Sequence, residues 1–198
     1  MANFEYTRGC VKITFDQLPQ LQPQIIETNN LSWWQHFINA RTPRKYILIQ
    51  DWCISVSGIS AKLDGTIVVT KGTEIDGASI PFPWFVAFIT FGILRPMGIL
   101  LTASIPHDYA FIHGKLNYKQ EGSEQLQQRV VQRHEVDYLF YQIVKEVNQA
   151  PIPAAISWLA VRLGWYWIKY NGKYRNGRFP LLITSLLALA LTGTLFLT

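Results

Sequence analysis

The chain has 198 residues, and its 18 Lys and Arg residues outnumber its 13 Asp and Glu residues, for a formal net charge of +5. A hydrophobic content of 49% with only 16% charged residues excludes a disordered chain. The two cysteines, Cys10 and Cys53, are too few for a disulfide-dense scaffold or a cysteine-rich zinc site.

The excess positive charge is confined to one segment. Residues 162–178 carry five basic side chains, and no Asp or Glu occurs from residue 162 to the C-terminus. Removing those five leaves 13 positive against 13 negative side chains, so residues 1–161 are neutral. A nucleic-acid-binding protein with basic side chains over a whole face is therefore disfavoured, and no nucleic-acid partner is expected.

Short segments rich in β-branched and aromatic residues occupy the first part of the chain. Four of them predict strands of an antiparallel sheet: 10–15, 45–50, 52–57 and 66–69. Ser57-Gly58 and Asp64-Gly65 predict hairpin turns, and residues 17–44 predict a loop with a short helix at 31–40. The first 15 residues are interrupted by charges and lack the apolar stretch of a secretory signal peptide, so none is expected.

An apolar run extends from Trp84 to Ser104, but Arg95 and Pro96 stand at its middle. A charged residue at the centre of a membrane is costly and proline breaks a helix, so the run predicts two short apolar segments. A hairpin that dips into a membrane is the alternative. Residues 117–124 are the most polar stretch and predict an exposed loop.

Helical spacing dominates after residue 124, and residues 124–148 predict an amphipathic helix. At 100° per residue Asp137 falls near the centre of its apolar face, with His134 at the edge and Glu135 on the opposite side. A buried carboxylate must be paired, hydrogen-bonded or bound to a metal. Two roles are therefore open for Asp137. It could form a structural pair with an Arg or a His, or it could take part in catalysis.

Residues 153–170 predict a helix that is apolar nearly all round, interrupted by Arg162 and Lys169, which lies either in the core or in lipid. Residues 179–198 carry no charge, and a helix of that length spans about 30 Å, the thickness of a bilayer's hydrocarbon core. This segment predicts a transmembrane helix, with a helix buried in the fold or in an oligomer as the alternative.

Aromatic and basic residues just before this segment suit a membrane interface and anionic headgroups. The residues expected to contact a membrane or a partner are Arg162, Trp165, Trp167, Lys169, Lys173, Arg175 and Arg178. The positive-inside rule then places the main domain in the cytoplasm.

Two short motifs could carry chemistry. The turn Asp76-Gly77-Ala78-Ser79-Ile80-Pro81 could hold a carboxylate and a hydroxyl near a ligand, or could be a turn with an Asp cap. His107-Asp108-Tyr109 could supply an imidazole and a carboxylate to a divalent metal, or a base with its orienting partner.

These residues permit three hypotheses. In a metal-dependent hydrolase the ligands of Zn, Mn or Fe would be Asp76, His107, Asp108 and Asp137, and a metal-bound water would be the nucleophile. In a serine hydrolase His107 would activate Ser79, although no G-x-S-x-G motif is present. In a non-enzymatic protein the same residues would form a polar network that locks a small domain.

The string DGASIP, an apolar stretch, HDY and then an Asp on a helix together resemble an uncharacterised family common in tailed phages and prophages, domain of unknown function 1353. The resemblance covers about residues 62–167. It implies that the following residues match the family pattern: Asp76, Gly77, Ser79, Pro81, His107, Asp108 and Asp137. It supplies no activity, and Phe82 stands where a basic residue commonly follows the proline.

The order of elements, strands first and helices later, predicts an α+β fold with a small antiparallel sheet in the N-terminal half. We expect a domain over residues 1–150, an aromatic and basic segment over 151–178, and the apolar segment over 179–198. The expected function is a phage- or prophage-associated structural or accessory protein, membrane-associated through its tail. Its partners would be a membrane or neighbouring phage subunits, within a virion or at the host inner membrane.

Overall fold

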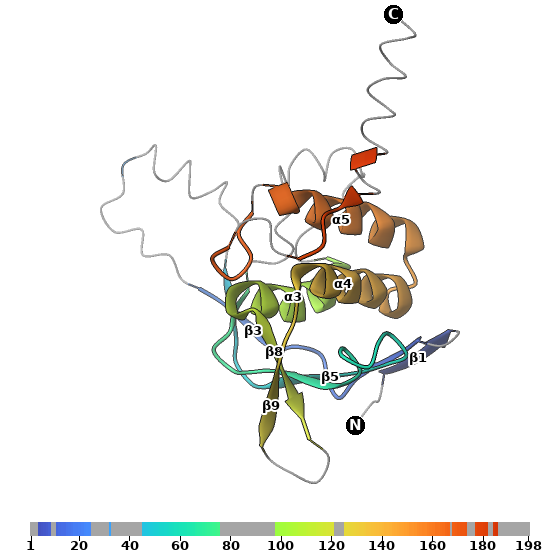
Figure 1. Ribbon diagram of the computed structural model, residues 1–198. Helices are drawn as coiled ribbons and strands as arrows, with labels where there is room; N and C mark the ends of the chain where they lie inside the picture. The colour runs from blue at the N-terminus through green and yellow to red at the C-terminus, as the bar shows by residue number, and fades with distance from the viewer. Residues whose placement is uncertain are drawn as a thin grey trace, which may run out of the picture.

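A computed structural model of the chain describes residues 4–8, 11–24, 32, 45–75, 98–120, 125–166, 168–173, 177–181 and 184–185. In these parts of the chain an antiparallel sheet lies beneath a group of helices (Figure 1). Most strands precede the first described helix in the sequence. The predicted α+β class, with strands in the N-terminal half and helices in the C-terminal half, is therefore confirmed.

Two antiparallel sheets are present among the described residues. The larger has the strand order β1-β2-β5-β6-β8-β9, with all neighbours antiparallel. Its strands are β1 (Phe4–Arg8), β2 (Val11–Phe15), β5 (Trp52–Ser57), β6 (Gly65–Val69), β8 (Lys115–Lys119) and β9 (Leu126–Val130). The smaller sheet has the order β3-β4-β7, made of β3 (Leu21–Pro23), β4 (Tyr46–Leu48) and β7 (Glu74–Ile75).

The large sheet buries one of its faces, because buried and more exposed side chains alternate along strands such as β5. In β5 the side chains of Trp52, Ile54 and Val56 are buried, whereas the residues between them are less so. Ile54 pairs with Phe15 on one side and with Ile67 on the other, so a row of apolar side chains crosses the sheet. Successive side chains of a strand point to opposite faces, so this row defines the face that the helices cover.

Three helices form the other side of the core: α3 (Leu101–His113), α4 (Arg133–Val147) and α5 (Pro151–Leu163), followed by a 3-10 turn, η1 (Gly164–Tyr166). Helices α3 and α4 pack on the strands and on each other, and α5 packs on α4 from the outside (Figure 1). Helix α4 begins with a capping box in which Gln132 and Glu135 satisfy each other's backbone N–H groups. These contacts place three helices around one buried region.

The strands predicted at 10–15, 45–50, 52–57 and 66–69 are confirmed as β2, β4, β5 and β6. The helix predicted over 124–148 begins only at Arg133, because residues 126–130 form β9. Likewise residues 117–119 belong to β8 rather than to a loop. Strand β9 is polar and largely exposed, so its own sequence has no strand periodicity, and its pairing with β8 determines its conformation.

The prediction of a transmembrane helix is wrong for the part of the chain that the structure describes, where no helix is long and apolar enough to cross a membrane. Helix α5 has 13 residues and is about 20 Å long, against the roughly 30 Å of a hydrocarbon core. Of the segment 179–198 only 179–181 and 184–185 are described, and of the run 84–104 only 98–104. The short helix predicted at 31–40 lies outside the described residues, apart from Ser32.

Candidate functional site

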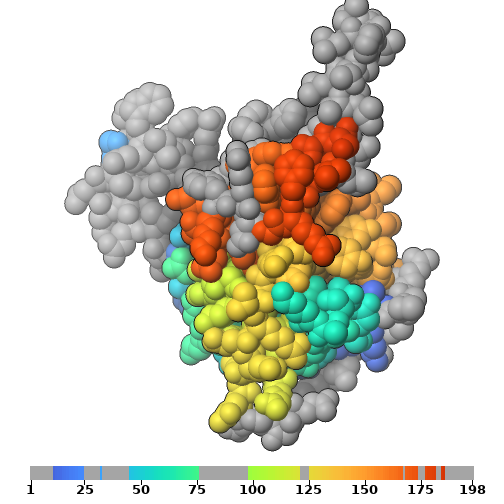
Figure 2. Space-filling model, viewed as in Figure 1, coloured from blue at the N-terminus to red at the C-terminus, as the bar shows by residue number. Residues whose placement is uncertain are grey.

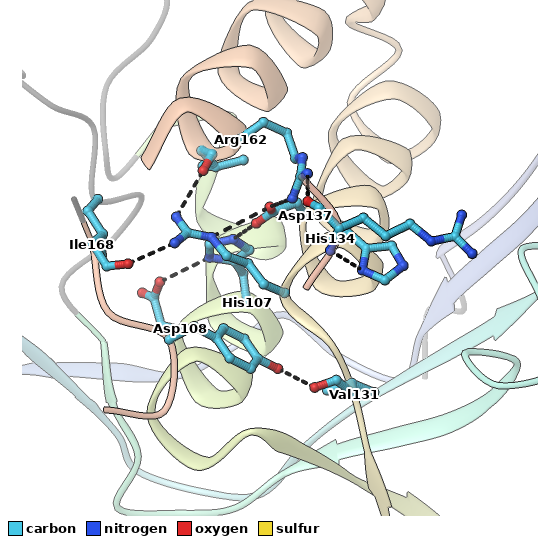
Figure 3. A network of polar contacts seen from close by, with 11 residues as sticks. His107, Asp108, Val131, His134, Asp137, Arg162 and Ile168 are labelled. Atoms are coloured by element: carbon cyan, nitrogen blue, oxygen red, sulfur yellow. Dashed lines mark hydrogen bonds and ion pairs between the residues drawn. The ribbon is translucent and has the colours of Figure 1, made fainter. Parts of the chain in front are cut away.

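Asp137 is the centre of a buried network of charged side chains that joins three helices (Figure 3). It lies on α4 and is fully buried. Its Oδ1 lies 3.0 Å from Nε2 of His107 on α3, and its Oδ2 accepts a hydrogen bond of 3.0 Å from Nη1 of Arg162 on α5. Each oxygen of this carboxylate is therefore held by a different neighbouring helix.

The helical spacing of α4 explains why Asp137 is buried. Val136, Phe140 and Ile143 on the same helix are also buried, so the carboxylate enters the core with apolar neighbours. Glu135 instead points outward and contacts Lys62 Nζ at 2.7 Å. The sequence-based predictions that Asp137 is buried and that Glu135 lies on the other side are thus confirmed.

His107 lies between two carboxylates. Besides the contact with Asp137, its Nδ1 lies 3.6 Å from Oδ1 of Asp108, and its ring stacks on Phe111 with 4.3 Å between centroids. Burial by itself would lower the pKa of His107, but Asp108 and Asp137 outweigh it and raise the pKa above its usual value. The two carboxylates therefore favour the imidazolium form.

Two arginines complete the network. Arg162 also donates from Nη2 to the backbone carbonyl of Arg178 at 2.6 Å. Arg133 donates from Nη1 to the carbonyl of Ile168 at 2.8 Å and from Nη2 to that of Val161 at 3.1 Å, and its Nε lies 3.9 Å from Oδ2 of Asp137. Burial lowers the pKa of Arg133, while Asp137 acts in the opposite direction.

A structural pair of Asp137 with an Arg or a His was one of the two expectations and is confirmed, but neither arginine was named as the partner, although the sequence holds a signal for each. Arg133 precedes Asp137 by four residues, the spacing at which side chains of a helix meet. Arg162 interrupts an otherwise apolar helix. His134, expected near this face, instead accepts a long hydrogen bond of 3.4 Å from the backbone N–H of Arg178.

A pocket of about 240 Å³ lies beside the network. Its described lining comes from α3, α4, α5, the residues after η1 and the small sheet. These residues are Lys45, Glu74, His107, Asp108, Phe111, Ile112, Arg133, Phe140, Val161, Ile168 and Lys169. His107 and Asp108 thus belong to the buried network and also line a space that a ligand could enter.

The prediction of a metal-binding site is wrong for the described residues, among which no group of three or more His, Cys, Asp or Glu side chains could hold a metal ion. His107, Asp108 and Asp137 are brought together as expected, but the Asp137 oxygens are held by His107 and Arg162, and Arg133 lies nearby. Arg133 and Arg162 place permanent positive charges beside Oδ2 of Asp137, which disfavours a divalent metal there. Asp76, the fourth predicted ligand, lies outside the described residues.

The remaining candidate residues fall into three groups. Arg162 and Trp165, expected at a membrane or partner surface, are buried, because the first turns inward to Asp137 and the second packs against Tyr166 and Phe179. The exposed ones are Lys169, Lys173 and Arg178. Those outside the described residues are Asp76, Ser79, Trp167 and Arg175.

Chemically, the arrangement can hold a proton and fix its position. A carboxylate that orients an imidazole is the usual partner of a histidine that transfers protons. Here a carboxylate lies on each side of His107, and both carboxylates stabilise its imidazolium form. The same contacts that could position a proton donor therefore bind α3 to α4.

The fold and the site define a small α+β protein with a buried Asp, His and Arg network beside an apolar pocket. A family model described as "Protein of unknown function (DUF1353)" matches residues 52–161, more than half of the chain. The protein belongs to this family, so the resemblance to it is confirmed. The match runs from β5 into α5 and ends one residue before Arg162. No curated protein and no solved structure matches the chain.

Proposed function

We propose that this protein is a structural or accessory protein of a phage or prophage, and that its buried charged network serves to hold the helices in place. The observation that carries the proposal is the burial and hydrogen bonding of Asp137. This carboxylate is fully buried, and each of its oxygens is bonded to a side chain from another helix, His107 from α3 and Arg162 from α5. Groups bonded in this way stabilise a fixed arrangement of helices.

The energetics of buried charges support a locking role. Removing one partner of a buried ion pair costs about 3–5 kcal/mol, because an uncompensated charge stays behind. Arg162 adds a second connection, since its other nitrogen donates to the carbonyl of Arg178 beyond the end of α5. One carboxylate thereby connects α3, α4, α5 and the backbone of residue 178.

Exposed apolar side chains on the outer surface support the proposal that this protein contacts a neighbouring protein subunit. Ile152 is 72% exposed and Ile156 is 42% exposed on α5, and Leu181 is 68% exposed after it. In Figure 2 the orange and red atoms of α5 and of the residues after it reach the molecular surface. Ile152 and Ile156 lie four residues apart, the spacing at which side chains share one face of a helix, and exposed apolar side chains on one face commonly mark a protein interaction site.

The phage setting rests on the resemblance of the sequence to a family common in tailed phages and prophages. The test is quantitative mass spectrometry of purified particles of the phage or induced prophage that encodes the chain, together with deletion of the gene. We expect a fixed copy number per particle and a lower yield of infectious particles after deletion. A protein absent from particles whose deletion leaves yield and infectivity unchanged would overturn the proposal.

The Asp137→Asn variant links the network to this role. We expect the variant to restore fewer infectious particles to the deletion strain than the wild-type gene does, because its helices are held less firmly. Asp16→Asn, the same chemical change at an exposed position, should restore the wild-type yield. Equal restoration by both variants would show that the network does not matter for the role.

A further inference from the structure

The pocket beside the network has the size and lining of a site for a small molecule. Its volume is about 240 Å³, and an apolar cavity of about 150 Å³ accommodates benzene. The space therefore suits a single ring with a short side chain. Its apolar walls are Phe111, Ile112, Phe140, Val161 and Ile168.

The charges at the pocket are unbalanced towards positive. Among the described residues the lining holds three permanent cations, Lys45, Arg133 and Lys169, against two anions, Glu74 and Asp108. One positive charge is therefore in excess even without protonation of His107, whose pKa is raised by Asp108 and Asp137. This excess favours an anion in the pocket.

Arg133 gives a second, independent indication. Its side chain lines the pocket and is only 1% exposed. Its Nε is a buried donor for which the described residues provide no hydrogen-bond acceptor, since Oδ2 of Asp137 lies at 3.9 Å. Buried donors in proteins are nearly always hydrogen-bonded, so this nitrogen is a position where an acceptor from a ligand would be favourable.

The charged groups at the mouth of the pocket, including its carboxylates, also favour an anionic ligand. Both oxygens of Glu74 already accept hydrogen bonds, from Gln24 at 3.1 Å and from Lys45 at 3.2 Å. Asp108 lies against His107, and Lys169 adds an exposed cation at the mouth. Both oxygens of Glu74 are thus engaged by donors, which disfavours a cationic ligand at the mouth.

We propose that this pocket binds a small organic monoanion, a carboxylate joined to an apolar body about the size of one ring. The apolar body lies against Phe111, Phe140 and Ile168, and the carboxylate compensates the excess positive charge of the lining near Arg133. The proposal is independent of the phage role, because it rests only on the size, walls and charges of the pocket.

The test is isothermal titration calorimetry of the full chain with 3-phenylpropionate and, as its cationic counterpart, 3-phenylpropylamine. We expect saturable binding of one 3-phenylpropionate per chain, and binding of the amine at least about ten times weaker. The two probes share the ring and the linker, so the comparison isolates the sign of the charge. Amine binding as tight as that of the acid, or no saturable binding of 3-phenylpropionate, would overturn the proposal.

Matched variants test whether 3-phenylpropionate binds in this pocket. Lys169→Gln removes a cation at the mouth and should weaken 3-phenylpropionate binding about two- to fivefold, the usual size of an exposed charge interaction. Lys119→Gln, at the far end of β8, should leave the affinity unchanged. Val161→Phe should fill the pocket and abolish binding in a protein that still unfolds cooperatively. Equal affinities for the two lysine variants would contradict the assignment, even if Val161→Phe failed to fold.

The affinity should also depend on pH through His107. The charged groups around its ring are Asp108 on α3, Asp137 and Arg133 on α4, and Arg162 on α5. His107 lines the pocket, and its protonation adds a further positive charge there, so 3-phenylpropionate should bind more tightly at pH 6 than at pH 9. Binding that is tighter at pH 9 would contradict the charge argument.

Discussion

Oδ2 of Asp137 and Nη1 of Arg162 lie 3.0 Å apart and join α4 to α5, with both side chains buried. The same aspartate contacts His107 on α3 through its other oxygen. An ion pair in this environment contributes little net stability compared with apolar packing, but the loss of one partner is costly. The network therefore makes the packing of three helices depend on a few specific side chains.

Asp137→Asn should lower the free energy of unfolding by about 3–5 kcal/mol. The substitution keeps the shape of the side chain but leaves Arg133 and Arg162 without their buried counter-charge, and His107 with Asp108 alone. Urea unfolding followed by circular dichroism measures the change. The exposed control Asp16→Asn should change stability by less than about 0.5 kcal/mol. Similar stabilities of the two variants would contradict the locking role.

Stability should depend on pH through His107. Because its pKa is raised in the folded protein, its contribution is fully present below the unfolded pKa, about 6.5, and is lost as the pH rises through the folded pKa. The free energy of unfolding of the wild type minus that of His107→Gln should therefore be larger at pH 6 than at pH 9. A difference of one pKa unit corresponds to about 1.4 kcal/mol.

The comparison of the wild type with His107→Gln makes the measurement specific to His107. The pKa of His134 is lowered by burial, but this residue is present in both proteins and cancels in the difference. Urea unfolding of both proteins at several pH values supplies the data. A difference between wild type and variant that stays constant or grows with pH would show that His107 is not stabilised as an imidazolium.

Gly114 ends α3 in the left-handed region, at φ 68°, and should tolerate no larger residue. A Cβ at this position would meet the side-chain amide of Asn171. Gly114→Ala should therefore destabilise the protein more than Gly72→Ala. Gly72 also has a positive φ, 84°, but has open space around it. Thermal unfolding of both variants gives the comparison, and equal changes in Tm would contradict close packing at Gly114.

Much of this site could be predicted from local patterns in the sequence. The helical spacing over residues 124–148 placed Asp137 on the apolar face, because neighbouring apolar residues on that face must enter the core. The β-branched and aromatic residues of 52–57 likewise predicted the strand β5. The adjacency of His107 and Asp108 indicated a polar site before any geometry was known.

The partner of Asp137 on α5 could not be predicted in the same way. Arg162 is 25 residues away, and in the sequence it belongs to a run of basic residues that suggested a surface. Only the packing of α5 on α4 turns this one cation inward while Lys169 and Lys173 remain exposed. Strand β9 was missed for a related reason, since its polar residues form a strand only through pairing with β8.

A double-mutant cycle between Asp137→Asn and Arg162→Met tests the locking role most directly. Free energies of unfolding of the wild type, both single variants and the double variant give the interaction energy of the pair. We predict that the double variant is more stable than the sum of the single changes implies, with an interaction energy of about 1.5–3 kcal/mol. Single changes that add to within about 0.5 kcal/mol would contradict a lock formed by these two residues.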